Sequence, residues 1–213
     1  YRRQRQMCIR DRDITSICGG LNINIGTLNK NTIPSMFLAG KKANALGHIV
    51  LLDPVGAGAS RLRTDTANRL MQEVRFDAVR GNISEIKTLC TGSGSTKGVD
   101  ADAVDAVTEA NLDNGVQLVK TFAAQTGCII AVTGAIDLVS DGERCWCIRN
   151  GRAEMSRITG TGCQLSALMT AFLVANPDRK LDAAAAAVCM MGLAGEIGWA
   201  NMQPGDGNST YRN

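Results

Sequence analysis

The sequence predicts an α/β fold in which a mainly parallel central sheet carries helices on both faces. Short apolar segments alternate along the chain with longer segments of helical spacing, which is typical of parallel strands connected by helices. Several of the short segments are continuously apolar, as expected for strands that are covered on both faces. Aromatic residues make up only 4% of the 213 residues. We therefore expect a core of aliphatic helices packed on aliphatic strands.

The first half of the chain contains three predicted strand–helix pairs. In each pair, a short apolar or alternating segment precedes a segment with apolar residues at helical spacing. The third helix opens with Asn82 and Glu85, whose separation by three residues fits a capping box. The expected strands cover residues 21–26, 48–52 and 76–80, and the expected helices cover 31–46, 61–74 and 82–89.

The second half is predicted to contain a further strand, a hairpin and three helices. Residues 91–98 are the only glycine- and serine-rich stretch and are expected to form a mobile loop. A hairpin is expected around the turn Asp141-Gly142, because apolar residues flank it on both sides. The expected strands cover 128–133, 137–140 and 144–148, and the expected helices cover 101–126, 163–175 and 181–200.

The net positive charge of the chain comes from its first twelve residues. The first twelve residues hold five arginines and one aspartate, so without them the count of Lys and Arg falls from 23 to 18 and that of Asp and Glu from 20 to 19. A body with a net charge of −1 excludes nucleic-acid binding as its main function. We expect residues 1–12 to be a disordered or non-native basic tail, and residues 13–213 to form a single α/β domain.

The sequence also argues against a membrane protein and against a zinc site. Its most apolar stretch, 183–195, is shorter than the ~20 residues that span a bilayer. The eight cysteines include no C-x-x-C pair, and His48 is the only histidine, so zinc-ligand spacings are absent. Scattered cysteines without a secretory signal favour reduced thiols in a cytoplasmic protein.

Four polar residues stand where a parallel sheet gathers its ligands. Asp53, Arg80 and Thr133 lie at the ends of the second, third and fourth predicted strands, and Glu85 follows soon after the third. In open α/β sheets, ligands bind at the carboxyl ends of the strands. The two carboxylates can hold Mg²⁺ directly or through water, and an arginine can clamp a phosphate. Each residue also has an alternative, purely structural role. These roles are a turn residue for Asp53, a helix cap for Glu85, a surface ion pair for Arg80 and a strand residue for Thr133.

Gly160-Thr161-Gly162 is the sharpest local signal, because it precedes a predicted helix. Glycines allow close approach of the backbone, and the free N–H groups of a helix N-terminus attract anions. The same motif is also found in ordinary turns. The Walker loop G-x-x-x-x-G-K-[ST] and the G-x-G-x-x-G dinucleotide fingerprint have no match in the sequence. Cys163 follows in the first turn of the helix, where it serves either as a base or as pocket lining.

Together these residues are similar to those of a known family. The sequence resembles the hydroxyethylthiazole kinases, which belong to the ribokinase-like superfamily. Any one of the matching segments is a weak signal, whereas five in the family's order are specific. The matching segments are 21–28 (LNINIGTL), 52–58 (LDPVGAG), 80–86 (RGNISEI), 131–134 (AVTG) and 160–163 (GTGC).

The resemblance implies an activity and a role for each candidate residue. The implied reaction is ATP-dependent phosphorylation of the hydroxyl of 4-methyl-5-(2-hydroxyethyl)thiazole, in thiamine biosynthesis or salvage. The family also implies a homotrimer with active sites between subunits. By position, Arg80 and Thr133 correspond to ATP-binding residues, and Asp53 and Glu85 correspond to the acidic residues near Mg²⁺. Gly160 corresponds to a thiazole-binding residue. Gly160, Thr161 and Gly162 correspond to the anion hole, and Cys163 corresponds to the catalytic position.

Three other functions stay open at this stage. Hydroxymethylpyrimidine kinases share the Gly-Thr-Gly-Cys turn, although the segment 80–85 fits the thiazole kinases better. The dehydratases that repair hydrated nicotinamide cofactors have a similar fold but carry Asp where Cys163 stands. The third alternative is an inactive nucleotide-binding module. Relative to the family, the chain is expected to lack segments at both ends, which predicts weak ATP binding and poor turnover.

Overall fold

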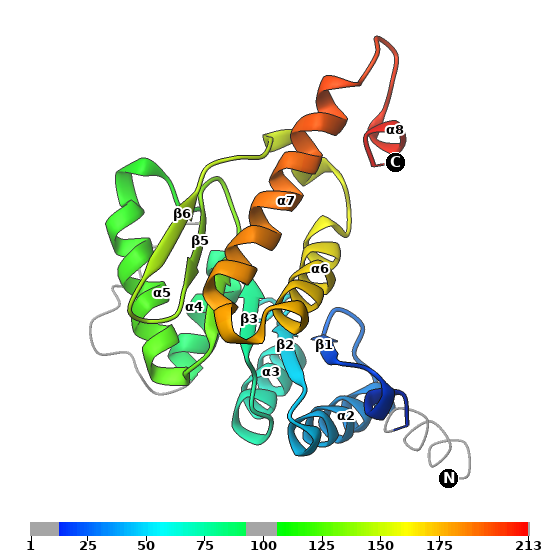
Figure 1. Ribbon diagram of the computed structural model, residues 1–213, viewed down its shortest axis with the longest axis vertical. Helices are drawn as coiled ribbons and strands as arrows, with labels where there is room; N and C mark the ends of the chain where they lie inside the picture. The colour runs from blue at the N-terminus through cyan, green and yellow to red at the C-terminus, as the bar shows by residue number, and fades with distance from the viewer. Residues whose placement is uncertain (1–12, 93–105, 213) are drawn as a thin grey trace.

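A single mixed sheet organises the part of the chain that the computed structural model describes, residues 13–92 and 106–212 (Figure 1). Within these residues its six strands follow one another in chain order, with no strand inserted between neighbours. The first four are mutually parallel, whereas the last two are antiparallel and form the predicted hairpin. The strands are β1 (Gly20–Asn24), β2 (Ile49–Asp53), β3 (Ala78–Gly81), β4 (Ile129–Val132), β5 (Asp137–Ser140) and β6 (Cys145–Ile148).

Helices cover both faces of this sheet, which confirms the predicted fold class. The four helices α2 to α5 contribute to one apolar cluster, and α6 and α7 contribute to another on the opposite face. The helices are α2 (Thr32–Leu46), α3 (Arg61–Glu73), α4 (Ile83–Gly92), α5 (Leu112–Thr126), α6 (Thr161–Ala175), α7 (Lys180–Ala200) and α8 (Asn208–Arg212), with short 3₁₀ turns at Glu109–Asn111, Ala153–Arg157 and Pro177–Arg179.

The strand β2 shows how the two clusters are separated. All five of its residues are buried. Because side chains alternate across a strand, Leu52 belongs to the cluster beneath α2 to α5, and Leu51 belongs to the cluster beneath α6 and α7. Neither leucine is exposed at all. The continuous apolar run in the sequence therefore corresponds to a strand that is covered on both faces, as predicted.

Two predicted helix ends are formed by the residues that the sequence indicated. Gly47 ends α2 in the left-handed region (φ 70°), and its N–H donates to the carbonyl oxygens of Ala43 and Asn44. At the start of α4, Asn82 N–H donates to Glu85 Oε2 (2.8 Å) and Glu85 N–H donates to Asn82 Oδ1 (2.8 Å), which is the predicted capping box.

The predictions around the glycine- and serine-rich stretch are only partly testable. The helix α4 continues to Gly92, so residues 91 and 92 are helical and the predicted loop at 91–98 begins too early. The rest of that loop lies outside the described residues, as do the basic tail 1–12 and the start of the helix predicted over 101–126.

The helix predicted to begin at residue 101 begins instead at Leu112. Thr108 has an extended backbone (φ −128°, ψ 170°), and its N–H donates to Asn111 Oδ1 (2.7 Å). Threonine and asparagine side chains compete in this way with helical hydrogen bonds. The preceding Val107 is also buried in the core. The polar cap therefore starts the helix about one turn after a buried valine, a break that helical spacing alone does not reveal.

The helix α7 is longer than the apolar stretch that the sequence analysis considered. Together with the preceding turn it forms a 24-residue segment, 177–200, which is long and apolar enough by composition to cross a membrane. The expectation that no described segment reaches this length is therefore wrong. One side of the helix packs inside the protein: Leu181, Ala184 and Val188 are buried in the cluster shared with α6. Met190, Leu193 and Ile197 of the same helix are exposed.

Candidate active site

The parallel strands bring the predicted polar residues to one edge of the sheet, which we call the carboxyl edge. Asn24 and Asp53 are the last residues of β1 and β2, Arg80 lies near the end of β3, and Thr133 follows β4. Since β5 runs in the opposite direction, its first residue, Asp137, lies at the same edge. Five polar side chains from five neighbouring strands therefore surround the carboxyl edge.

Asp53 is the buried centre of this group. Its side chain is fully buried, and its Oδ2 accepts hydrogen bonds from Asn24 Nδ2 (2.8 Å) and Ser166 Oγ (2.9 Å). Burial raises the pKa of the carboxyl, and the Arg80 guanidinium, the largest opposing influence, lowers it. Its Oδ1 has no hydrogen-bond partner among the described residues and lies 3.8 Å from Arg80 Nη1. One oxygen of this carboxylate is thus available to a further partner.

Arg80 joins three of the predicted elements of the site. Its Nη2 donates to Thr133 Oγ1, and its Nη1 faces Asp53. A Cβ added to Gly162 would lie only 2.5 Å from Arg80 Nη1, so the guanidinium rests against the glycine backbone. Arg80 Nε is buried and has no hydrogen-bond partner within the described part of the chain. The structure thereby brings together Asp53, Arg80, Thr133 and the Gly-Thr-Gly segment at the start of α6.

Glu85 connects two loops of the carboxyl edge. Its Oε1 accepts from Gly56 N–H (2.8 Å) in the loop after β2, and its Oε2 accepts from Asn82 N–H (2.8 Å) at the start of α4. Its side chain is buried, and its negative charge is one of the smaller influences that raise the pKa of Asp53. Both of its oxygens already accept hydrogen bonds. Glu85 therefore caps α4, and any binding of a metal would be an additional role.

The start of α6 has the geometry expected of an anion site. The helix begins at Thr161, two residues earlier than predicted, so Thr161 and Gly162 belong to its first turn and only Gly160 precedes it. Gly160 is the N-cap residue and has φ 94°, a left-handed conformation that favours glycine. No heavy atom of the described residues lies within 4 Å of a Cβ placed on Gly160, so the space beside it is open. The first N–H groups of any helix lack partners within the helix. Those of Thr161, Gly162 and Cys163 therefore lie beside Arg80, where a negative charge would be stabilised.

Cys163 is exposed, and it is linked to Asp53 through one residue that the sequence analysis did not single out. Asn24 Nδ2 donates to Cys163 Sγ (3.1 Å) as well as to Asp53 Oδ2. Ser166 was also missed, although its spacing of three from Cys163 on a helix places both side chains on neighbouring positions. For Asn24 the only available signal was an asparagine at the end of a strand beside a predicted site.

Asp137 is a third residue that sequence reasoning did not assign to the site. Burial raises the pKa of its carboxyl to about 6, against the lowering effects of the Gly134 N–H and of Arg80. Gly134 N–H donates to its Oδ1 (2.8 Å). A carboxyl that titrates near neutral pH therefore lies within the electrostatic reach of Arg80.

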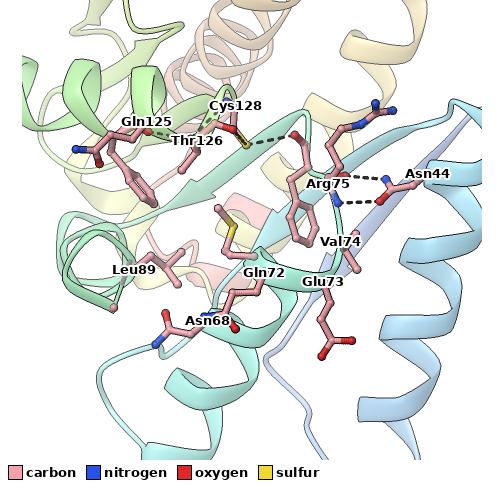
Figure 2. A pocket seen from close by; sticks show the side chains of 14 residues that line it. Asn44, Asn68, Gln72, Glu73, Val74, Arg75, Leu89, Gln125, Thr126 and Cys128 are labelled. Carbon is pink, nitrogen blue, oxygen red and sulfur yellow. Dashed lines mark hydrogen bonds between the residues drawn. The ribbon is translucent and has the colours of Figure 1, made fainter. Parts of the chain in front are cut away.

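One cavity of the described residues lies away from this site. It has a volume of about 680 Å³ and is lined by residues that precede the strands, among them Asn44, Arg75, Thr126 and Cys128 (Figure 2). Asn44 is held there by a pair of 2.7 Å hydrogen bonds with the backbone of Arg75. This cavity is at the opposite edge of the sheet, whereas the charged groups described above converge at the carboxyl edge. We therefore place the candidate active site at the carboxyl edge.

Comparison with known proteins identifies the family. The model of the hydroxyethylthiazole kinase family matches residues 8–211. The chain belongs to the hydroxyethylthiazole kinase family. It is 56% identical over 201 residues to the hydroxyethylthiazole kinase of Clostridium acetobutylicum, with 94% of this chain and 74% of that protein covered. The predicted family is thus confirmed.

Solved structures agree with this membership. A hydroxyethylthiazole kinase protein from Pyrococcus horikoshii is similar with a TM-score of 0.81 and 30% identity, covering 95% of this chain and 71% of that one. A ribokinase-like superfamily protein from Enterococcus faecalis has a TM-score of 0.67 at 12% identity, covering 96% and 64%, which supports the fold alone. The protein is therefore a kinase with a ribokinase-like fold.

Proposed function

We propose that this protein transfers the γ-phosphoryl group of ATP to the hydroxyl of 4-methyl-5-(2-hydroxyethyl)thiazole, a step of thiamine metabolism. The observation that carries the proposal is the contact of the Arg80 guanidinium with Asp53, Thr133 and the backbone of Gly162. It brings a cation, a hydroxyl and the amides of a helix N-terminus to one point, as phosphoryl transfer requires. Family membership supplies the substrate class.

In the proposed complex, the two substrates meet at the start of α6. The Arg80 guanidinium and Thr133 bind the phosphates of ATP, and Gly160 borders the thiazole in the open space beside it. The N–H groups of Thr161, Gly162 and Cys163 stabilise the charge on the transferring phosphoryl group. Because the two substrates are held in this orientation, phosphoryl transfer between them is accelerated.

The transfer exchanges one phosphorus–oxygen bond for another. The alcohol oxygen forms a bond to the γ-phosphorus, and the bond from that phosphorus to the β–γ bridging oxygen breaks, so ADP leaves. The hydroxyl proton is accepted by Cys163 Sγ in its thiolate form, which gives the thiol, and the thiol later releases the proton to solvent. The exposed sulfur is suited to this role because it already serves as the acceptor of a hydrogen bond from Asn24.

The carboxylates fit a Mg²⁺ ion that arrives with ATP. Asp53 Oδ1 has no hydrogen-bond partner among the described residues, and Glu85 accepts from Gly56 N–H in the loop that follows Asp53. Since the described residues contain no group of three or more candidate ligand side chains, these two carboxylates would hold the ion through its waters and the phosphates. When bound, Mg²⁺ neutralises phosphate charge.

A coupled assay for ADP tests the proposed function. With Mg²⁺ and ATP, the thiazole alcohol should give turnover, whereas 4-amino-5-hydroxymethyl-2-methylpyrimidine, the substrate of the rival kinase, should give at least tenfold less. Cys163→Ser serves as a variant in which the proposed acceptor of the hydroxyl proton is weakened. Turnover that is equal on both alcohols, or confined to the pyrimidine, would overturn the substrate assignment.

We further propose a homotrimer in the cytoplasm. Large apolar side chains of α7, namely Met190, Leu193 and Ile197, are exposed at helical spacing, which favours association. Free thiols at Cys18, Cys163 and Cys189 suit a reducing compartment. Size-exclusion chromatography with light scattering tests the trimer, and a monomer at micromolar concentration would contradict it.

A further inference from the structure

Asn24 makes contacts that no assigned role explains. It is the last residue of β1 and reaches two groups of the site with a single amide nitrogen. Nδ2 lies 2.8 Å from Asp53 Oδ2 and 3.1 Å from Cys163 Sγ. A side-chain amide nitrogen carries two hydrogens, so each acceptor receives one of them. Asn24 therefore bridges the buried carboxylate and the exposed sulfur.

The orientation of this amide is determined by its third contact. Asn24 Oδ1 accepts from Gly26 N–H (2.8 Å). A backbone N–H can only donate and an ionised carboxylate can only accept, so the reversed amide would make two unfavourable contacts. A Cβ on Gly26 would approach Asn24 Oδ1 to 2.9 Å, which shows how tightly the turn encloses the oxygen. The nitrogen is thereby directed at Asp53 and Cys163.

A donated hydrogen bond has a definite consequence for the sulfur. Sγ acts as the acceptor, and a donor to sulfur favours the thiolate over the thiol. The start of α6 acts in the same direction, as does Arg80, whose guanidinium lies beside Gly162. The carboxylates of Asp53, Glu85 and Asp137 at the same edge act against it. The Asn24 amide lies between the sulfur and the nearest of these carboxylates.

We propose that Asn24 is a positioning residue: its amide fixes the Cys163 sulfur at the start of α6 as a hydrogen-bond acceptor and links it to Asp53. The sulfur then faces the substrate hydroxyl ready to receive its proton. The kinetic part of this inference rests on the proposed function, whereas the state of the sulfur does not. Ser166, which donates to the same oxygen of Asp53 but has no described contact with Sγ, provides a matched control.

The test measures alkylation of Cys163 by iodoacetamide across pH 6–10 in the full chain without ligands. Mass spectrometry of the Cys163 peptide gives the pH at which the alkylation rate is half its maximum, which we call the midpoint. Exposed Cys189 in the same samples serves as an internal reference. Asn24→Leu removes both donors at similar volume, and Asn24→Ser is a smaller alternative should the leucine variant fail to fold. We expect the Cys163 midpoint to rise by about one pH unit in either variant, because a hydrogen bond to a charged group is lost.

Controls separate positioning from a structural role. Ser166→Ala should leave the Cys163 midpoint within about 0.3 pH unit, and Cys189 should be unchanged in all variants. An unchanged Cys163 midpoint in a folded Asn24 variant would overturn the inference.

Kinetic measurements then distinguish the positioning role of Asn24 from the proposed function of the protein. In an active enzyme, Asn24→Leu should lower kcat about tenfold, leave KM for ATP within about twofold, and shift the pH profile of kcat with the alkylation midpoint. A shifted midpoint in a protein without thiazole kinase activity would leave the positioning role standing and overturn the proposed function. Equal losses in kcat and in ATP affinity, with no pH shift, would identify a structural role instead.

Discussion

At the scale of single residues, the site depends on how buried charges are balanced. Asp53 is fully buried, and its two oxygens are served by different partners: Asn24 and Ser166 on one, Arg80 near the other. An arginine suits this place because its planar fork reaches several acceptors at once. The same guanidinium donates to Thr133 Oγ1, and its Nε has no hydrogen-bond partner among the described residues. The contacts that stabilise the buried charges of the site are therefore made by the same residues that are proposed to bind its ligand.

Removing the Arg80 guanidinium should weaken nucleotide binding. Arg80→Ala deletes charge-assisted donors that are each worth about 1.5–3 kcal/mol, so the affinity for ATP–Mg²⁺ should fall at least tenfold in isothermal titration. Arg144→Ala, in the distant hairpin turn, is the matched control and should bind ATP as the parent does. Full affinity in Arg80→Ala would remove Arg80 from the nucleotide site.

The Asp137 carboxyl should give a measurable pH dependence of stability. Burial raises its pKa from 3.8 to about 6, so the folded state binds the proton more tightly than the unfolded state. Its contribution to stability is therefore present below pH 4 and is lost as pH rises through 6. Since one pKa unit is worth about 1.4 kcal/mol, the loss amounts to at most about 3 kcal/mol at pH 8.

Asp137→Asn tests this directly, because the amide oxygen can still accept from Gly134 N–H. Urea denaturation should show the variant more stable than the parent by about 1–3 kcal/mol at pH 8 and nearly equal to it at pH 4. A variant that is less stable at pH 8 would mean that the charged carboxylate is favourable in the folded state.

At the scale of elements, the sequence was informative where a local pattern decides the structure. The capping box of Asn82 and Glu85 is a local device and was predictable from spacing. The start of α5 was not, because the burial of Val107 and the cap at Thr108 depend on the surrounding core. The role of Asn24 was also hidden, since its partners lie 29 and 139 residues away along the chain. Contacts between distant segments leave little trace in a single sequence.

The start of α6 offers a test of the contact between Gly162 and Arg80. In Gly162→Ala, the new Cβ would lie 2.5 Å from Arg80 Nη1 and must displace the guanidinium. We expect ATP affinity to fall at least fivefold. The free energy of unfolding should also fall, because the buried Asp53 loses its cationic partner, although alanine favours a helix over glycine by up to about 1 kcal/mol.

Gly207→Ala is the control for this change, because a Cβ there meets no heavy atom of the described residues within 4 Å. It should leave ATP affinity unchanged when measured by the same titration. An equal loss of affinity in both variants would show that the effect at Gly162 is not specific to Arg80.

At the scale of the whole molecule, the sheet divides the apolar interior into two clusters, and both should matter for stability. Leu51 and Leu52 are adjacent and fully buried, and they face opposite clusters. Leu51→Ala and Leu52→Ala should each lower the free energy of unfolding by about 2–5 kcal/mol in urea denaturation. A loss below about 0.5 kcal/mol for either leucine would mean that its face of the sheet is open to solvent.

The reversal of strand direction after β4 has a practical consequence. Since β5 runs away from the carboxyl edge, the turn at Asp141-Gly142 emerges at the far side of the molecule from Arg80 and the Gly-Thr-Gly segment. Glu143, exposed in that turn, is therefore a suitable place to attach a fluorophore or to anchor the enzyme on a biosensor surface. A probe fixed there would leave the candidate active site at the carboxyl edge unobstructed.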